Sequence, residues 1–252
     1  MNFLDQTVIV TGGGTGIGLE IVKAYLDEGA NVVLSGRREE TLKKSIKSLI
    51  KFKEKNKERL LSVKSDMSDE KQVINLFKRA KEKFSSIHIL INNAGVWSET
   101  PLSQCTSKEI DFTFNNNLKT TILGTKIAGE KLTTGGSIVN IGSFASILSI
   151  KSASLYSTYK AAVGHFTKSA AAELAEKNIR VNCVIPGVVK TPMTDDYIAK
   201  HYDRLIKPIS LKRFGTPQEI AAGVLFLTSE KKASYITGIS LEITGGKYLT
   251  QL

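Results

Sequence analysis

Residues 8–18 read VIVTGGGTGIG, and this stretch decides the fold of the chain. A short run of β-branched residues leads directly into glycines, after which Ile17, Ile21 and Tyr25 recur at the spacing of one helix face. Glycines allow a tight turn and let a pyrophosphate approach the helix N-terminus, where free backbone amides attract anions. The order of strand, glycine-rich turn and amphipathic helix therefore predicts a nucleotide-binding unit at the start of the chain.

The alternation of strand and helix continues along the whole sequence. It predicts a parallel sheet of about seven strands with helices on both faces. The predicted strands are 7–10, 31–34, 60–63, 87–91, 137–141, 179–185 and 239–243. The segments between them are helical at 43–59, 73–84, 154–177 and 217–228, with a long connection at 103–131. No internal repeat or composition break is present, so we expect one doubly wound α/β domain of the Rossmann type over residues 1–252.

Composition excludes several classes of protein. The 252 residues are 41% hydrophobic and 23% charged, as in a globular protein rather than a disordered one. No apolar run approaches the ~18 residues of a membrane helix, and residues 1–10 do not resemble a signal peptide. Cys105 and Cys183 are too few for a disulfide framework or a zinc site, and no cluster of acids and histidines indicates a metal. We therefore expect a cytoplasmic protein without a metal.

The net charge of +11 raises the question of a nucleic-acid partner. Much of the excess lies in residues 43–59, where lysines are interspersed with apolar residues as on a solvated helix face. Aromatic residues make up 7% of the chain and are spread thinly, whereas a nucleic-acid site needs stacking aromatics within a basic patch. We therefore expect a small-molecule partner, and neither nucleic acid nor membrane.

The residues after the second predicted strand bear on the choice of nucleotide. The segment 35–38 reads Ser-Gly-Arg-Arg, and no acid precedes Glu39. A site for NAD usually places an acid here to bind the ribose 2′-hydroxyl, whereas a guanidinium suits the 2′-phosphate of NADP. The sequence thus predicts NADP(H) as the preferred nucleotide, with NAD(H) as the alternative. The competing interpretation is that both arginines are solvated surface charges.

A tyrosine and a lysine suited to proton transfer stand four residues apart. Tyr156 and Lys160 share one face of a predicted helix. Ser143 lies just past the fifth strand, where strand ends deliver side chains to a ligand crevice. A free phenol has a pKa of ~10, which is a poor match to neutral pH. A nearby ammonium favours the phenolate, so we expect Lys160 to lower the pKa of Tyr156.

Several short motifs, in the same order, resemble those of the short-chain dehydrogenase/reductase family. They are Thr11-Gly12-x-x-x-Gly16-x-Gly18, Asn92-Asn93-Ala94-Gly95, Tyr156-x-x-x-Lys160, Pro186-Gly187 and Tyr235-Ile236-Thr237-Gly238. The resemblance covers essentially the whole chain. One departure is the segment 244–246, Thr-Gly-Gly, where many relatives have Asp-Gly-Gly; it affects a local turn and not the chemistry.

The resemblance implies a role for each matching residue. The implied catalytic residues are Asn117, Ser143, Tyr156 and Lys160. Ser143 and Tyr156 would contact the substrate, Lys160 would also bind the nicotinamide ribose, and the asparagine would hold a water, with Asn116 as the alternative register. The implied nucleotide-binding residues are Gly12, Gly14, Thr15, Gly16, Ile17, Gly18, Ser35, Arg37, Arg38, Asp66, Met67, Asn93, Ala94, Gly95, Tyr156, Lys160, Pro186, Gly187, Val189 and Thr191. For Asp66, which would meet the adenine, the alternative is that it caps a helix.

These roles predict an oxidoreductase that transfers hydride between NADP(H) and a carbonyl or secondary alcohol, with Tyr156 as the acid and base. One form of this activity is the reduction of 3-oxoacyl thioesters, since a basic surface suits acidic acyl carriers. The alternatives among enzymes are an NAD-dependent sugar or polyol dehydrogenase and an enoyl or dienoyl thioester reductase. A nucleotide-sensing regulatory protein is the alternative from another class, although such a protein often lacks a catalytic residue and this chain retains all of them.

The substrate end and the assembly can also be predicted. The expected pocket walls are Val96, Trp97 and Phe144, together with a mobile lid at residues 192–208 that mixes charged and aromatic residues. The competing interpretation of the lid is a plain surface helix. Residues 152–175 are rich in alanine and serine, which lets two such helices approach closely across a twofold axis. We therefore expect a homotetramer, or a dimer of the same type.

Overall fold

The computed structural model describes residues 2–52, 54 and 56–249. Within them, seven strands form one sheet in the order β3-β2-β1-β4-β5-β6-β7, and every neighbouring pair is parallel. The strands are β1 Thr7–Thr11, β2 Asn31–Gly36, β3 Leu60–Lys64, β4 Ile89–Asn92, β5 Ser137–Ile141, β6 Arg180–Pro186 and β7 Ser240–Ile243. The strand order reverses direction between β1 and β4, which is where an open parallel sheet binds its ligand. The doubly wound α/β fold predicted from the sequence is confirmed.

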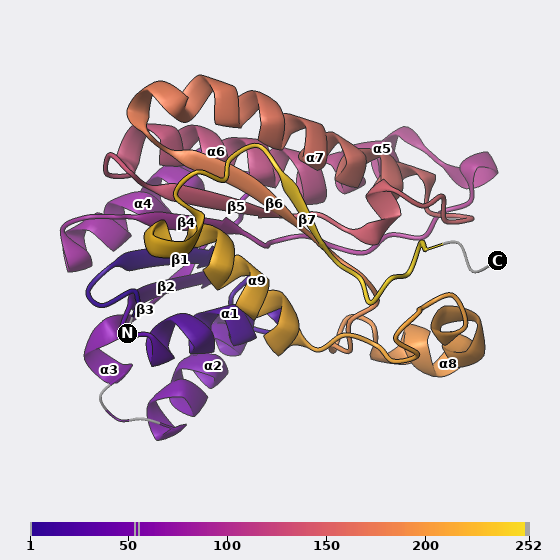
Figure 1. The fold of residues 1–252 in the computed structure, drawn as a ribbon, viewed down its shortest axis with the longest axis horizontal. Coiled ribbons are helices and arrows are strands. Elements are labelled where there is room, and N and C mark those ends of the chain that lie inside the picture. The colour runs from indigo at the N-terminus through magenta and orange to yellow at the C-terminus, as the bar shows by residue number, and fades with distance from the viewer. Residues whose placement is uncertain (1, 53, 55, 250–252) are drawn as a thin grey trace.

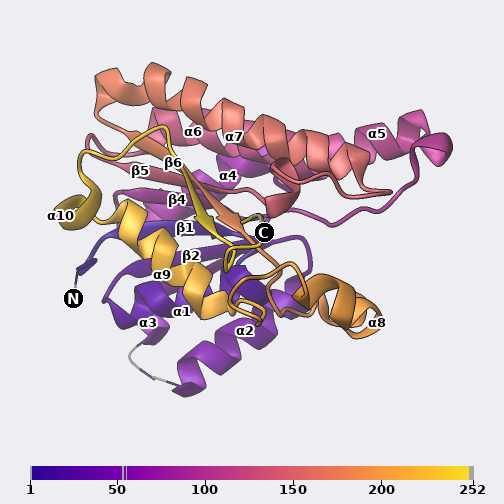
Figure 2. The same cartoon turned by 45° about the vertical axis from the view of Figure 1, so that its right-hand side comes forward.

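Helices cover both faces of the sheet (Figure 1). One face carries α1 Gly16–Asp27, α2 Glu39–Phe52 and α9 Pro217–Thr228, and the other carries α4 Glu70–Phe84, α6 Thr120–Lys131 and α7 Ser154–Leu174. Figure 2 shows the two helical layers on either side of the strands. The shorter helices are α3 Asn56–Arg59, α5 Ser107–Phe114 and α10 Glu230–Ala233, and α8 Asp195–Ile206 lies apart from the others, past the ends of the strands. None of the helices described is long and apolar enough to span a lipid bilayer.

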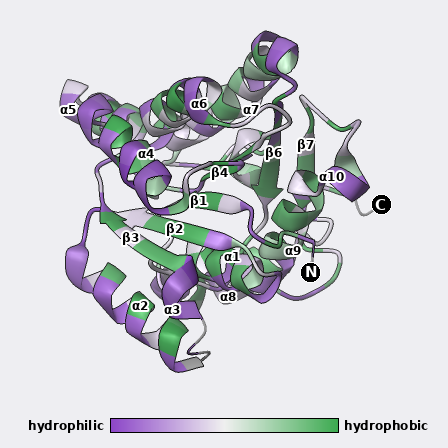
Figure 3. Cartoon of the chain, turned by 90° about the vertical axis from the view of Figure 1, so that its left-hand side faces the viewer, coloured by the Kyte–Doolittle hydropathy of each residue, from purple (hydrophilic) through white to green (hydrophobic). Residues whose placement is uncertain are grey.

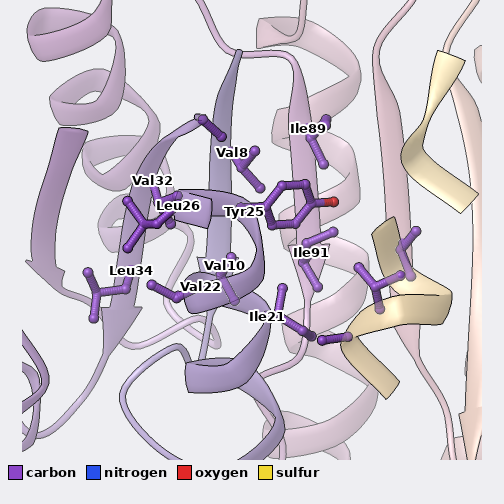
Figure 4. Close-up of a cluster of buried hydrophobic side chains, with 14 of the residues drawn as sticks. Val8, Val10, Ile21, Val22, Tyr25, Leu26, Val32, Leu34, Ile89 and Ile91 are labelled. Carbon is purple, nitrogen blue, oxygen red and sulfur yellow. The ribbon is translucent and has the colours of Figure 1, made fainter. Parts of the chain in front are cut away.

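The alternation of side chains along β1 divides the core into two layers. Val8 and Val10 face α1, where they pack with Tyr25 in the cluster drawn in Figure 4. Ile9 points to the opposite face and packs with Phe77 of α4. All of these side chains are buried, and burial of each contributes roughly 1.5–3 kcal/mol. A strand that is apolar on both sides is therefore held at the centre of the sheet, and the glycine turn at its end is held with it.

Two helical predictions differ from the structure in detail. The long connection at 103–131 is divided into a 3₁₀ turn (Leu102–Gln104), α5, a π-helical turn (Asn115–Lys119) and α6. A capping box between Thr106 and Glu109 fixes the start of α5. The predicted helix at 43–59 is replaced by α2 and α3; residues 53 and 55 lie outside the described residues, as do 1 and 250–252 of the predicted domain. In Figure 3, hydrophilic and hydrophobic residues alternate along α2, as predicted for a helix with one solvated face.

Candidate active site

A cavity of about 590 Å³ lies at the carboxyl ends of the strands, on both sides of the reversal between β1 and β4. Every residue predicted from the sequence to be catalytic or to bind the nucleotide lines it. Val96, Trp97 and Phe144, the predicted pocket walls, line it as well. Residues more than 170 positions apart in the chain thus meet in one cavity because parallel strands end at the same edge of the sheet.

The glycine turn is held in a shape that leaves room for a ligand. Gly12 has φ +64°, and a Cβ on Gly18 would lie 2.3 Å from the carbonyl oxygen of Gly12. The hydroxyl of Thr11 accepts hydrogen bonds from the backbone amides of Asn93 and Ala94, each with an N···O distance of 3.0 Å. The side-chain amide of Asn93 donates to the carbonyl oxygen of Thr11 over 2.9 Å. These contacts lock the turn after β1 to the turn after β4, so the helix α1 begins at the floor of the cavity.

The far end of the cavity gathers the residues predicted to contact the adenosine. Arg37 is exposed, and its Nη1 donates to Oδ1 of Asn116 over 2.8 Å. Asp66 accepts from the backbone amide and hydroxyl of Ser68, over 2.9 and 2.8 Å. The N-cap of α4 is Asp69, so the alternative in which Asp66 caps the helix is wrong. Asp66 instead holds a turn at the mouth of the cavity.

Three further residues line this end that the sequence reasoning did not single out: Thr41, Leu42 and Ser65. Thr41 and Leu42 lie in the first turns of α2, directly after the segment that contains Arg37 and Arg38. A helix that directly follows a strand packs back over the end of that strand. The position of Thr41 and Leu42 in the first turns after the second strand was therefore the signal in the sequence that could have identified them.

The predicted proton-transfer residues meet at the opposite end of the cavity. Helix α7 carries Tyr156 and Lys160 one turn apart, and Lys160 Nζ lies 5.8 Å from the centroid of the Tyr156 ring. Lys160 Nζ donates to the carbonyl oxygen of Ile141, at the end of β5, over 2.9 Å. Ser143 caps the 3₁₀ turn Phe144–Ser146, where its hydroxyl accepts from the backbone amide of Ala145 over 3.2 Å, and it lines the same cavity as Tyr156. Serine, tyrosine and lysine thus converge from β5 and α7.

Burial disfavours the charged forms of both Tyr156 and Lys160. Burial raises the pKa of Tyr156, and the hydrogen bond with Ser143 lowers it in part. Burial lowers the pKa of Lys160 to about 8. The shift is opposite to the predicted lowering of the Tyr156 pKa, because desolvation of the phenol is its largest cause.

Asn117, rather than Asn116, lies beside the lysine. Its side chain is fully buried in the π-helical turn, where Oδ1 accepts from the backbone amide of Val96 over 3.2 Å. A Cβ on Gly95 would lie 3.0 Å from Asn117 Oδ1 and 3.5 Å from Lys160 Nζ. Asn116 is half-buried and lines the cavity where it contacts Arg37. The wide π turn brings the buried amide into the cavity.

The segment predicted to be a lid contains α8, and Tyr197, Ile198 and Leu205 of this helix line the cavity. Trp97 packs edge-on against Tyr156 with ring centroids 4.7 Å apart, and against Tyr197 of α8 at 5.9 Å. Tyr197 in turn contacts His201, whose backbone is not helical and kinks α8. A small cluster of buried residues, including Leu205, packs α8 onto the segment after β6. Aromatic contacts therefore link Tyr197 of α8, through Trp97, to Tyr156.

The C-terminal edge of the sheet supports the same cavity. Gly187 lies so close to the segment after β7 that a Cβ would be 2.8 Å from Thr244 Cα. Gly245 and Gly246 have φ of +65° and +74°, so the turn forms with threonine in place of the aspartate of many relatives. Thr191, directly before the segment predicted to be a lid, is held by Thr194, whose Oγ1 accepts from the backbone amide of Thr191 over 3.0 Å.

Comparison with known proteins identifies relatives over the full length of the chain. The family model described as enoyl-(acyl carrier protein) reductase matches residues 12–247. The 3-oxoacyl-[acyl-carrier-protein] reductase FabG of Buchnera aphidicola is 34% identical over 252 residues, covering 99% of this chain and 100% of that protein. The 3alpha-hydroxysteroid dehydrogenase of Mediterraneibacter gnavus is 36% identical over 253 residues, covering 97% and 98%.

A solved structure extends the likeness to the whole fold. The short-chain dehydrogenase of Burkholderia cenocepacia in complex with NADP superposes with a TM-score of 0.90, at 30% identity and with 99% and 100% of the two chains covered. Together with the convergence of Ser143, Tyr156 and Lys160 in one cavity, these matches give the family. The chain belongs to the short-chain dehydrogenase/reductase family and is an oxidoreductase that acts on carbonyl compounds or alcohols.

Proposed function

We propose that the protein is an NADP(H)-dependent carbonyl reductase in which Tyr156 is the acid and base. The observation that carries this proposal is the convergence of Ser143, Tyr156 and Lys160 in the same cavity as the glycine turn. Two hydroxyl groups that line the same end of one cavity can both bind one carbonyl oxygen. The glycine turn in the same cavity would hold a dinucleotide, which would supply the hydride for that carbonyl group.

The fit of a dinucleotide rests on the shape of the glycine turn. A Cβ on Gly12 would lie 2.9 Å from Asn93 Nδ2, and one on Gly18 would strike the Gly12 carbonyl, so side chains here would fill the space that a pyrophosphate needs. The N-terminus of α1 opens onto this space and favours an anion. Arg37 and Arg38 line the adenosine end, and this supports NADP(H) over NAD(H).

The nucleotide, when bound, supplies the hydride. The Tyr156 hydroxyl gives its proton to the carbonyl oxygen, and the Ser143 hydroxyl donates a hydrogen bond to the same oxygen and orients it. Burial keeps the phenol protonated, which is the form that reduction requires. The ammonium of Lys160 stabilises the phenolate that remains, and Asn117 places a buried amide beside that ammonium.

Two other activities of the same family remain to be separated from this one. Reduction of an enoyl thioester is suggested by the description of the family model, but the presence of both the Ser143 and the Tyr156 hydroxyl in the cavity suits a carbonyl oxygen. Sugar or polyol oxidation needs polar groups for several hydroxyls, whereas Trp97, Phe144 and Tyr197 line the substrate end. The walls favour a carbonyl compound with an apolar body, and a 3-oxoacyl thioester is one such compound.

Oxidation of NADPH by the purified protein tests the proposal. The panel contains a 3-oxoacyl thioester, an aryl ketone, a steroid ketone and a ketose, with crotonyl coenzyme A as the enoyl substrate. We expect turnover with at least one ketone and none with crotonyl coenzyme A. Turnover with crotonyl coenzyme A alone would establish the enoyl activity. Tight binding of NADPH with no turnover of any compound would favour a nucleotide sensor.

A further inference from the structure

An arginine and an asparagine from distant segments meet at the predicted adenosine end of the cavity. Arg37 directly follows β2, and Asn116 lies in the π-helical turn Asn115–Lys119 between α5 and α6. Nη1 of Arg37 donates to Oδ1 of Asn116 with an N···O distance of 2.8 Å. Both residues line the cavity. The guanidinium proposed to meet the 2′-phosphate is therefore attached to the turn that follows α5.

A second hydrogen bond fixes the direction in which the Asn116 amide faces. Its Nδ2 donates to the carbonyl oxygen of Phe112, four residues earlier in the chain, with an N···O distance of 2.8 Å. A side-chain amide has a donor end and an acceptor end, so a nitrogen bound to this carbonyl turns the oxygen toward Arg37. In the opposite orientation the amide nitrogen would face another donor, and both contacts would be lost. Asn116 is thus held from α5 and presents a fixed acceptor to Arg37.

This acceptor restricts the motion of a long side chain at the surface. Arg37 is exposed, and ordering a side chain of this length on binding a ligand costs conformational entropy. A guanidinium has several N–H groups, so a contact with Asn116 through one of them leaves the others for a phosphate. The amide is neutral and does not repel the phosphate. A guanidinium that is ordered before the nucleotide arrives loses less entropy when it binds.

A local role in α5 accounts for one end of the amide and not for the other. The contact with Phe112 is a bond from a side chain to a nearby carbonyl, as asparagine often forms at helix ends. The contact with Arg37 joins residues 79 positions apart at the cavity. Asn115, of the same type and in the same turn, is half-buried and is not among the described residues that line the cavity. It offers a matched control for Asn116.

We propose that Asn116 is a positioning residue that orients Arg37 for the 2′-phosphate of NADP(H), and so contributes to the choice of nucleotide. This inference rests on the proposed preference for NADP(H) and adds to it a residue from the π-helical turn. The effect of Asn116 falls on the nucleotide that carries the phosphate and spares NADH. Because Asn116 acts through Arg37, its effect disappears when Arg37 is removed.

A double-mutant cycle on the purified protein tests the inference. We expect Asn116→Ala to raise KM for NADPH about three- to tenfold, because the released guanidinium must then be ordered on binding. KM for NADH, and kcat with either nucleotide, should change by less than about twofold. In the Arg37→Ala background, Asn116→Ala should change KM for NADPH by less than about twofold. Asn115→Ala should leave the kinetic constants for both nucleotides unchanged.

Asn116→Asp separates the acceptor from its neutrality. The carboxylate can still accept from Arg37, but it places a negative charge beside the phosphate, so KM for NADPH should rise by more than in Asn116→Ala. Equal losses for NADPH and NADH in Asn116→Ala would show a structural role and overturn the inference. It is also overturned if Asn116→Ala lowers KM for NADPH, since the amide would then compete with the phosphate for Arg37. The same effect of Asn116→Ala with and without Arg37 would overturn it as well.

Binding measured without turnover keeps this inference distinct from the proposed function. Adenosine 2′,5′-bisphosphate and adenosine 5′-monophosphate differ in the 2′-phosphate, and calorimetric titration with each gives the contribution of that group. We expect the wild type to bind the bisphosphate more tightly and Arg37→Ala to remove this difference. Asn116→Ala should reduce the difference about three- to tenfold. Neither probe needs a carbonyl substrate, so the test remains valid if the proposed reaction is wrong.

The outcomes of these titrations assign a failure to one proposal or to the other. If the wild type binds both probes equally, the proposed preference for NADP(H) is wrong and the inference falls with it. If Arg37→Ala removes the difference and Asn116→Ala leaves it intact, the preference stands and the role of Asn116 is rejected.

Discussion

Lys160 donates a hydrogen bond from Nζ to the carbonyl oxygen of Ile141 over 2.9 Å, and this bond ties α7 to the end of β5. The same helix carries Tyr156, and the chain from Ile141 leads within two residues to Ser143. This contact therefore joins the two segments that carry the three proton-transfer side chains. It also holds an ammonium in a buried place, which costs stability and keeps the charge beside the phenol.

Removing the phenol oxygen should abolish the reaction but not nucleotide binding. We expect Tyr156→Phe to reduce kcat by a factor of roughly 10²–10⁴, because the proton donor is lost. The Kd for NADPH, measured by fluorescence titration, should change by no more than a few-fold. Tyr159→Phe is the matched control, since Tyr159 lies on the same helix and packs against Phe114. A Tyr156→Phe variant that keeps more than about a tenth of the rate would show that another group donates the proton.

The buried ammonium of Lys160 should make the protein less stable at neutral pH than a variant without it. The folded pKa of about 8 lies below the value of about 10.5 in the unfolded chain, so the unfolded state binds more protons between these values. The wild type bears the full cost below pH 8, and this cost disappears as the pH rises to about 10.5.

Urea unfolding of Lys160→Met measures this cost. At pH 7 the variant should have a free energy of unfolding higher by about 1–3 kcal/mol, the upper value following from the pKa difference. The difference should shrink as the pH rises from 8 to 10, while turnover stays lost at every pH. Lys168→Met, at an exposed site on the same helix, is the control. A variant that is less stable at pH 7 would contradict the argument.

The parts of the site that local spacing determines could be predicted from the sequence. The glycine turn and the pair Tyr156 and Lys160 follow from the strand–helix pattern, and parallel strands bring them to one edge. The contact of Arg37 with Asn116, and the burial of Lys247 against Phe144, join segments about 80 and 100 residues apart. Such contacts depend on side-chain packing. The predicted direction of the pKa shift of Tyr156 was wrong for the same reason, because desolvation depends on the whole surrounding structure.

Exposed apolar residues on α5 bear on the predicted assembly. Phe112 and Ile110 are 50% and 41% exposed on this helix, which packs beside α7. Because such residues are costly in water, we expect α5 and α7 to be covered by a second copy of the chain in a dimer or tetramer. Phe112→Glu should shift the mass measured by light scattering toward the 27.5 kDa subunit, whereas Ile74→Glu on α4 should not. A wild-type protein that is monomeric at micromolar concentration would refute the expected oligomer.

The preference for NADPH should depend on Arg37. The 2′-phosphate carries close to two negative charges, and a guanidinium can meet it with paired hydrogen bonds worth roughly 1.5–3 kcal/mol each. In this structure Arg37 Nη1 contacts Asn116 Oδ1, so the side chain already reaches across the mouth of the adenosine end. We expect Arg37→Ala to raise KM for NADPH by roughly ten- to a hundredfold and to leave KM for NADH nearly unchanged.

A second substitution tests whether charge alone sets this choice of nucleotide. A Cβ on Gly36 would meet only Leu42 Cδ2, at 3.6 Å, so an aspartate fits there without strain. Gly36→Asp combined with Arg37→Ala should favour NADH, because the carboxylate repels the 2′-phosphate and binds the free ribose hydroxyl. Arg79→Ala, on the exposed surface of α4, controls for the loss of one positive charge from the molecule. The residue of the glycine turn that lines this part of the cavity is Thr15, which has no charge. The positive charge at the predicted adenosine end therefore comes from Arg37 and Arg38. Equal kinetic constants for NADPH and NADH in the wild type, or equal effects of Arg37→Ala on both, would show that the arginines do not read the phosphate.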